Sequence, residues 1–390
     1  MTAAPRIEWQ EGDASHAARW RSEAGLPPPK RVVVIDDTMS ADDAYHLACE
    51  GTALLWRGDF QNARQMLQAM ARRVEQKPRR ARQRAADAAK TAAPGDAFHR
   101  HRLMQSQRAR TLAALLLPLD ADYAMPLRRA PDVRAACVEA YGPVNADASA
   151  SVVSLREILG LVGAHEWRKK GVEVPAAGGR IHPHYGVFSP IRGEYVDLVA
   201  RAPLPATTLA FDIGTGTGVL AAVLARRGVE RIIATDTDPR ARACATENLT
   251  RLRLARQVEV IDADLFPEGR APLIVCNPPW VPARTSSPIE AAVFDPESRM
   301  LLGFLRGLAA HLTPGGEGWL ILSDFAEHLG LRPRADLDAA IAAAGLTVLD
   351  RIDVKPVHPR AADRTDPLHQ ARSAELTSLW RLSADVRFGA

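Results

Sequence analysis

Between residues 207 and 390, short continuous apolar runs alternate with longer segments in which apolar residues recur every three or four positions. Runs of the first kind indicate buried strands, and the second pattern indicates helices that pack on them. The strands are expected at 209–212, 232–236, 257–262, 273–275, 318–324, 347–354 and 375–383. This alternation predicts an α/β fold with a seven-stranded sheet and helices on both of its faces.

The first 170 residues follow the helical pattern. Residues 41–75, 130–142 and 152–162 carry apolar side chains at helical spacing, whereas 31–36 (RVVVID) is typical of a short strand. A Gly/Pro-rich loop is expected at 171–180 (GVEVPAAGGR), where we place the domain boundary. We therefore expect a mainly helical N-terminal domain in residues 1–170 and a second domain in residues 171–390.

The composition is that of a globular protein, with 47% hydrophobic and 25% charged residues in a chain of 390. The sequence has no apolar run near the ~20 residues of a membrane span, and MTAAPRIEWQEGD lacks the apolar segment of a signal peptide. Its four cysteines are widely spaced and form neither a disulfide framework nor a CxxC motif. We therefore expect a cytoplasmic protein without membrane association and without a metal.

The most biased segment is 72–110, which carries twelve Lys/Arg against three Asp/Glu, although the whole chain has a net charge of only +4. Such a segment can neutralise nucleic-acid phosphates, and it can equally be the solvated face of a helix. The N-terminal domain is therefore a candidate for recognising an RNA or DNA substrate, and both interpretations stay open.

The sequence TTLAFDIGTGTGV (207–219) predicts a strand, a glycine-rich turn and the start of a helix. Gly214, Gly216 and Gly218 permit positive φ and let the backbone approach a ligand closely, and Asp212 precedes them at the strand end. In a dinucleotide-binding G-x-G-x-x-G turn the third glycine would occupy position 219, which is Val219. The spacing therefore disfavours a nicotinamide-dependent oxidoreductase.

The G-x-G-x-G spacing after an acid resembles motif I of the class I S-adenosylmethionine (SAM) methyltransferases, whose fold is Rossmann-like. The resemblance implies that Asp212 and the three glycines bind SAM, together with Asp236 at the tip of the second strand, which would accept the ribose hydroxyls. ADLF (263–266) resembles the GDLF of release-factor glutamine methyltransferases and implies that Asp264 receives the adenine amino group, with Asp262 as the competing residue. These enzymes, like ribosomal RNA guanine methyltransferases of the "small domain" group, carry an F/L-x-P-R segment over the cofactor, which Phe188 would match.

The most informative motif is NPPW, at the end of the fourth strand. It resembles the [D/N]-P-P-[F/Y/W] motif of enzymes that methylate a nitrogen on a planar group. The oxygen of Asn277 and the carbonyl of Pro278 can each accept an N–H of the acceptor, which turns the nitrogen lone pair toward the methyl group. Pro278 and Pro279 fix φ and remove donors, and Trp280 can stack on the planar group. We interpret these four residues as catalytic.

The sequence therefore predicts a SAM-dependent N-methyltransferase whose acceptor is a protein glutamine amide or an exocyclic amine of an RNA or DNA base. A small-molecule or peptide acceptor stays open. So does a non-catalytic nucleic-acid-binding protein with this fold, although Asp212, Asp236 and Asn277 count against it.

Overall fold

The computed structural model describes residues 4–75, 94–146, 148–285, 290, 293–357, 363–364 and 366–384. The chain separates into two compact units, Met1–Glu166 and Trp167–Ala390. The division falls within helix α6 (Leu155–Lys170), and the boundary expected at 170/171 lies at the end of that helix.

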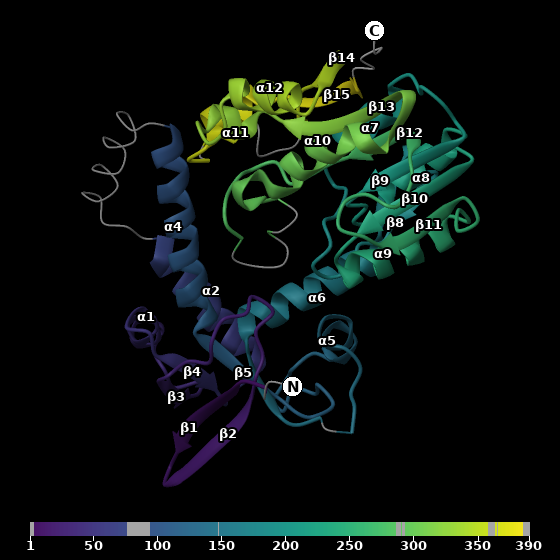
Figure 1. Ribbon diagram of the computed structural model, residues 1–390. Coiled ribbons are helices and arrows are strands. Elements are labelled where there is room, and N and C mark those ends of the chain that lie inside the picture. The colour runs from purple at the N-terminus through teal and green to yellow at the C-terminus, as the bar shows by residue number, and fades with distance from the viewer. Residues whose placement is uncertain are drawn as a thin grey trace. The chain divides into compact units, whose positions relative to one another are not determined.

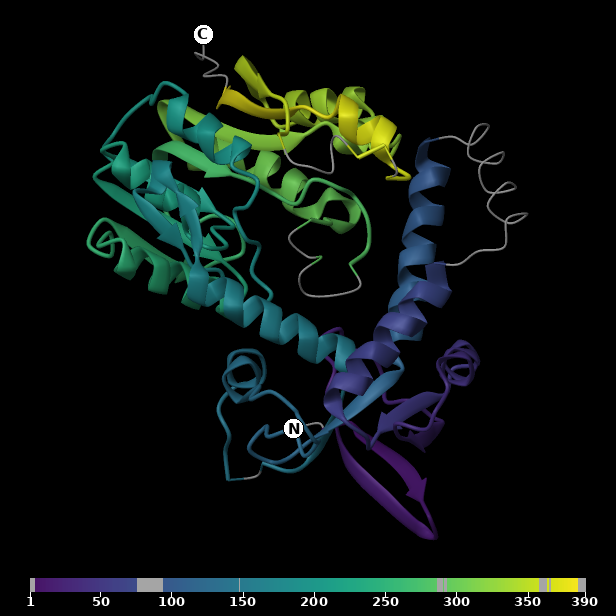
Figure 2. The ribbon, with the colours of Figure 1, turned by 180° about the vertical axis from the view of Figure 1, so that it is seen from behind.

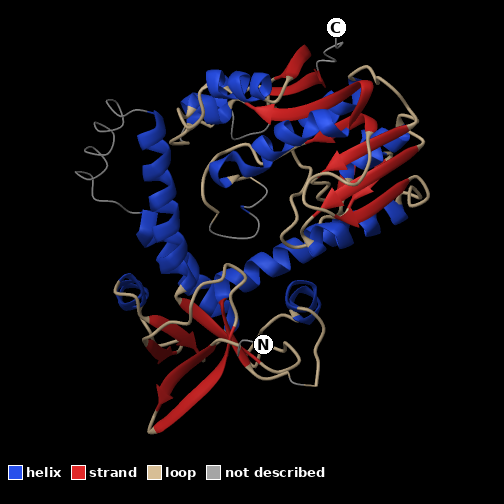
Figure 3. Ribbon diagram, in the orientation of Figure 1, coloured by secondary structure: helices blue, strands red, loops and turns tan. Residues whose placement is uncertain are grey.

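The N-terminal unit is built on a six-stranded sheet (Figure 3). In spatial order its strands are β1 (Arg6–Glu11), β2 (Ala14–Trp20), β6 (Ser151–Ser154), β5 (Leu115–Leu119), β4 (Ala53–Trp56) and β3 (Val32–Ile35). Its helices are α1 (Ala41–Cys49), α2 (Phe60–Glu75), α4 (Pro94–Ala113), α5 (Arg134–Tyr141) and the first part of α6.

Helices hold more residues of this unit than strands, but the expectation of a mainly helical domain missed the sheet around which they are arranged. The error lies in short apolar runs such as 53–56 and 151–154, which are buried strands of four residues. A run of that length has the same pattern as one turn of a buried helix, so periodicity cannot separate the two. Of the basic segment 72–110, residues 76–93 lie outside the described residues.

The C-terminal unit contains the predicted seven-stranded sheet (Figure 1). In spatial order its strands are β11 (Val258–Asp262), β10 (Arg231–Asp236), β9 (Leu209–Ile213), β12 (Ala271–Cys276), β13 (Leu312–Ser323), β15 (Thr377–Ala384) and β14 (Leu346–Val354). The last strand, β15, is antiparallel to both of its neighbours, β13 and β14.

Helices cover both faces of this sheet (Figures 1 and 2). Alternate residues along each central strand enter two separate cores, so that Ala210 faces one core and Phe211 the other. The first core is closed by α7 (Glu194–Arg201), α8 (Val219–Arg226) and α9 (Pro239–Arg251), and the second by α10 (Arg299–His311) and α12 (Arg334–Ala343). The short helices α11 (Phe325–His328) and α14 (His369–Ala374) complete the unit.

The segment expected to be a loop at 171–180 is mostly an antiparallel hairpin, β7 (Val172–Val174) and β8 (Gly179–Ile181), joined by a 3-10 turn at Pro175–Ala177. The glycines and proline that suggested a loop form its turn. In the part of the chain that the structure describes, no helix is long and apolar enough to cross a membrane.

Candidate active site

The strand register brings three predicted features to one level of the sheet. Ile213, the last residue of β9, pairs with Thr235 of β10 and with Cys276 of β12. The next residue along each chain therefore lies at the same edge of the sheet. These residues are Gly214 and Asn277, which follow their strands, and Asp236, which is the last residue of β10. Strand order reverses between β9 and β12, and ligands of open parallel sheets bind at such a point.

Each glycine of the turn has a positive φ, +70° for Gly214, +55° for Gly216 and +79° for Gly218, but they have different surroundings. A side chain at Gly218 would lie 3.2 Å from the Cα of Ala245 in α9, and one at Gly214 would meet the side chain of Met300. No atom of the described residues lies within 4 Å of the Cβ position at Gly216. Gly218 thus lets two helices approach, and Gly216 leaves its backbone open to a ligand.

Asp212 is buried beneath the turn and holds it in place. Its Oδ2 accepts a hydrogen bond from the Thr215 hydroxyl at 2.6 Å and another from the Ala221 N–H in the first turn of α8 at 3.1 Å. Burial raises the pKa of Asp212 to about 6; the two hydrogen bonds limit the rise and the charge of Asp236 adds to it. The carboxylate is therefore an uncompensated negative charge under the turn whenever it is ionised.

Asp236 stands beside the turn with both oxygens engaged by the backbone. Oδ2 accepts the Gly216 N–H at 3.0 Å, and Oδ1 accepts the Asp238 N–H at 2.9 Å. Burial raises the pKa of Asp236 as well. Each carboxylate oxygen has two lone pairs, so the group can still accept hydrogen bonds from two ligand hydroxyls.

The two candidates on the third strand differ in position. Asp262 is level with Asp236 in the β10–β11 register and lies 3.0 Å from Arg242. Asp264 follows two residues beyond the strand, is exposed, and pairs with Arg299 at the start of α10 at 2.7 Å. Both carboxylates therefore lie at the correct edge and both are ion-paired, so position alone does not separate them.

Within the NPPW segment, the Trp280 indole Nε1–H donates to Oδ1 of Asn277 at 2.9 Å. This bond holds the carboxamide oxygen toward Trp280 and occupies one of the two lone pairs of that oxygen. The carbonyl of Pro278 accepts no hydrogen bond from the described residues. One lone pair of the Asn277 carboxamide oxygen and the carbonyl oxygen of Pro278 thus remain to accept N–H groups of a bound substrate.

Trp280 is in turn held by residues that the sequence did not single out. The Arg192 guanidinium lies 5.4 Å from the centre of a Trp280 ring and donates to Glu194 and to Glu375, each at 3.1 Å. Glu375 also accepts the Ser323 hydroxyl at 2.7 Å. Arg192 and Glu375 are 183 positions apart, so no local motif could have linked them.

The loop before α7 contains Phe188, which the sequence predicted, and the two histidines His182 and His184. Phe188 is half-buried in it. The imidazole Nδ1 of His182 lies 2.6 Å from the Arg168 carbonyl, and Nε2 of His184 lies 2.7 Å from Glu247, so the two histidines have separate partners. The described residues contain no group of three or more side chains that could together hold a metal ion.

The start of α10 closes the site from the other face of the sheet. The buried carboxylate of Asp295 accepts the backbone N–H groups of Met300 at 3.0 Å and Leu301 at 3.1 Å, which anchors the first turn of the helix. Met300 then reaches Gly214. Immediately before the helix, Glu297 has φ +58°, a strained value for a side chain of this kind.

Part of the chain is similar to known proteins. Residues 179–331 match the family model of the methyltransferase small domain. The chain is 33% identical over 177 residues to a release factor glutamine methyltransferase of Cereibacter sphaeroides. The matched region covers 42% of this chain and 62% of that protein.

It is also 38% identical over 144 residues to a ribosomal protein L11 methyltransferase of Pelotomaculum thermopropionicum, covering 36% of this chain and 39% of that protein. A tRNA1(Val) (adenine(37)-N6)-methyltransferase of Pedobacter heparinus is 32% identical over 117 residues, 28% of this chain and 50% of that protein. The chain therefore spans less than two thirds of the length of these relatives.

Proposed function

We propose that this protein transfers a methyl group from S-adenosylmethionine to a nitrogen on a planar group, because residues 179–331 match the family model of the methyltransferase small domain. The observation that carries the proposal is the Asn277 carboxamide, which is oriented by Trp280 and level with the glycine turn. The relatives named above include enzymes for glutamine and for adenine, and both are planar nitrogen acceptors.

The residues at the strand ends fit this cofactor. The open space above Gly216 allows the backbone to meet a ligand directly, and Asp236 lies next to it, where ribose hydroxyls could donate to the carboxylate. The ionised carboxylate of Asp212 would favour a cationic group over the turn. When bound, the cofactor supplies an electrophilic methyl group on a sulfonium centre.

The chain's own contribution is orientation. An amide or aromatic amine nitrogen is a poor nucleophile because its lone pair is delocalised. If its two N–H groups donate to Asn277 Oδ1 and to the Pro278 carbonyl, the lone pair is directed away from both. The same two oxygens offset the positive charge that develops on the nitrogen, and Trp280 provides a flat surface against the planar group.

The test is the substitution Asn277→Ala with two readouts. We expect methyl transfer from labelled cofactor to a protein or RNA fraction to fall at least a hundredfold, since an oriented polar group at a reacting centre contributes about 10²–10³ in rate. Cofactor affinity, measured by calorimetry, should stay within about threefold of the wild type.

Equal loss of both activity and cofactor binding would contradict the assigned role, because Asn277 would then serve the cofactor pocket or the fold. Wild-type protein that gives no heat with the cofactor or its demethylated product would contradict the proposed function itself. The fraction that becomes labelled distinguishes the acceptors: a protein fraction indicates a glutamine amide, and an RNA or DNA fraction indicates a base amine.

A further inference from the structure

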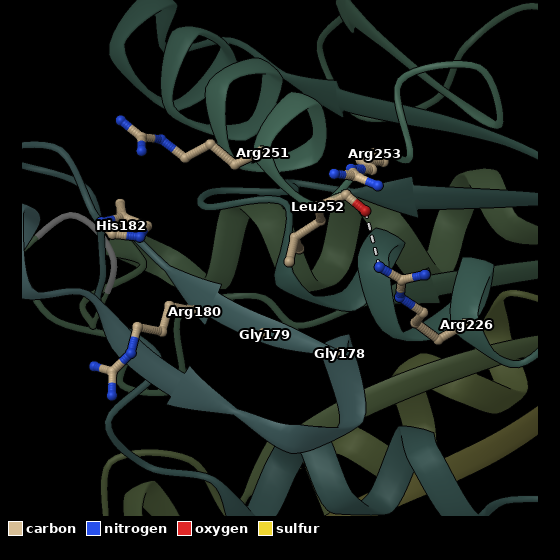
Figure 4. A pocket seen from close by; sticks show the side chains of 8 residues that line it. All are labelled: Gly178, Gly179, Arg180, His182, Arg226, Arg251, Leu252 and Arg253. Atoms are coloured by element: carbon tan, nitrogen blue, oxygen red, sulfur yellow. Dashed lines mark hydrogen bonds between the residues drawn. The ribbon is translucent and has the colours of Figure 1, made fainter.

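A hollow of about 430 Å³ lies away from the proposed catalytic edge, at the C-terminal ends of α8 and α9 and beside the β7–β8 hairpin. The residues with basic side chains that line it are Arg180, Arg226, Arg251, Arg253 and His182. Within the described residues, no carboxylate lines the hollow. Figure 4 shows Arg226 and Arg253 on one side of it, around the Leu252 carbonyl, and Arg180, Arg251 and His182 toward the other side.

Two of these guanidinium groups have no acidic partner in the part of the chain that the structure describes. Arg226 donates only to backbone carbonyls, from Nε to Ala177 at 3.2 Å and from Nη2 to Leu252 at 2.8 Å. The side chain of Arg253 forms no hydrogen bond or ion pair with any described residue, and only its backbone N–H is bonded, to the Thr250 carbonyl. A carbonyl satisfies a donor but leaves the charge uncompensated, so both guanidinium groups keep a full positive charge in the lining of the hollow.

The other two arginines are paired at their outer ends. Arg180 lies 3.2 Å from Glu173, and Arg251 lies 2.7 Å from Glu247, one helical turn earlier. Four guanidinium groups are thus set against two carboxylates among the described residues, and an excess of two positive charges remains in a concave site. A concave surface of one sign concentrates the field and attracts an anion of opposite charge.

The shape of the hollow depends on a pair of glycines at the turn of the hairpin. A Cβ at Gly178, where φ is +76°, would lie 2.6 Å from Nε of Arg226. A Cβ at Gly179 would lie 2.9 Å from the side chain of Leu252. The absence of side chains at these positions lets Arg226 lie flat against the hairpin, where it ties the hairpin to the end of α9 and forms the floor of the site.

We infer that this hollow is a binding site for a phosphate group, held by the guanidinium groups of Arg253 and Arg226 with Arg180 and Arg251 at its rim. The planar fork of arginine matches two phosphate oxygens, and a charge of −1 to −2 on the ligand balances the excess. The site goes beyond the proposed methyl transfer and does not depend on it. The phosphate belongs either to the backbone of a nucleic acid or to a free phosphate compound, which share the same chemistry.

The test uses the full chain and the substitution Arg253→Gln, because Arg253 is exposed and its side chain supports no other part of the fold. Arg256→Gln is the matched control. Arg256 lies three positions after Arg253, its side chain is exposed and does not line the hollow, and its substitution removes the same charge. Two probes are compared, a labelled short single-stranded RNA by fluorescence anisotropy over a range of KCl concentrations, and inorganic phosphate by calorimetry. Thermal unfolding of both variants checks that they fold.

If the phosphate belongs to a nucleic acid, Arg253→Gln should weaken RNA binding about tenfold and lower the slope of log K against log [salt] by about 0.7, the value for one lost contact to a single strand. The control should match the wild type. If the source is a free compound, inorganic phosphate should bind to the wild type and the control but not to Arg253→Gln, and RNA binding should be equal in all three. Equal binding of both probes by Arg253→Gln and Arg256→Gln would overturn the inference. Cofactor calorimetry on the same samples reports on the proposed methyl transfer separately.

Discussion

The buried carboxylate beneath the glycine turn makes the stability of the C-terminal unit depend on pH. Asp212 is 1% exposed, and its pKa is raised from 3.8 to about 6, chiefly by burial. In the unfolded chain the same carboxyl group has its ordinary pKa of 3.8, so between about pH 4 and pH 6 the folded state holds the carboxyl proton more tightly than the unfolded state does. Stability from this group is therefore complete below about pH 4 and is lost as the pH rises to 6.

The magnitude follows from the size of the shift. A difference of about two pKa units, at ~1.4 kcal/mol for each unit, corresponds to about 3 kcal/mol of unfolding free energy. In Asp212→Asn the position cannot ionise, although its amide oxygen can still accept the Ala221 N–H. Subtracting the free energy of the variant from that of the wild type at each pH removes the contributions of groups that do not interact with Asp212; the coupling to Asp236 stays in the difference.

The assay is urea unfolding of both proteins at half-unit steps from pH 4 to pH 7.5. Because the two units can unfold separately, amide hydrogen exchange in residues 209–226 is used to assign the transition of the C-terminal unit. The wild-type free energy minus that of Asp212→Asn should fall by about 2–3 kcal/mol across this range, mostly below pH 6.5. A difference that stays constant, or that increases with pH, would refute the assignment of a raised pKa to Asp212.

Two further substitutions test the site and the turn. Trp280→Phe keeps an aromatic ring but removes the 2.9 Å hydrogen bond to Asn277. We expect kcat to fall about three- to tenfold, equivalent to ~0.5–1.5 kcal/mol, with cofactor affinity unchanged. An unaltered kcat would show that the bond does not orient the carboxamide. Gly218→Ala should lower the Tm by ~2–4 °C more than Gly228→Ala. Both positions have positive φ, but only at Gly218 would the new Cβ lie 3.2 Å from the Cα of Ala245. Equal losses of Tm in thermal unfolding would mean that backbone strain alone, without the helix contact, sets the effect.

The sequence was a good guide wherever a pattern is local and repeated. Short apolar or alternating runs recur between helical segments over residues 207–390, and this regular alternation predicted all seven strands of the C-terminal sheet. The glycine turn at 214–218 was also readable, because alternate glycines mark positive φ directly. The N-terminal sheet was not, because strands as short as 53–56 have no period of their own.

The relations among these elements came from the tertiary structure. No motif shows that Asn277 would leave the sheet level with the glycine turn, since that depends on the register of β9 and β12. Nor could the sequence show that Arg192 is bound to Glu375, 183 positions away, and supports the ring of Trp280. Local patterns reflect how residues close together in the chain are arranged, and the sequence alone determined this local conformation. Contacts between distant segments depend on how whole elements pack, and only the folded chain decides them.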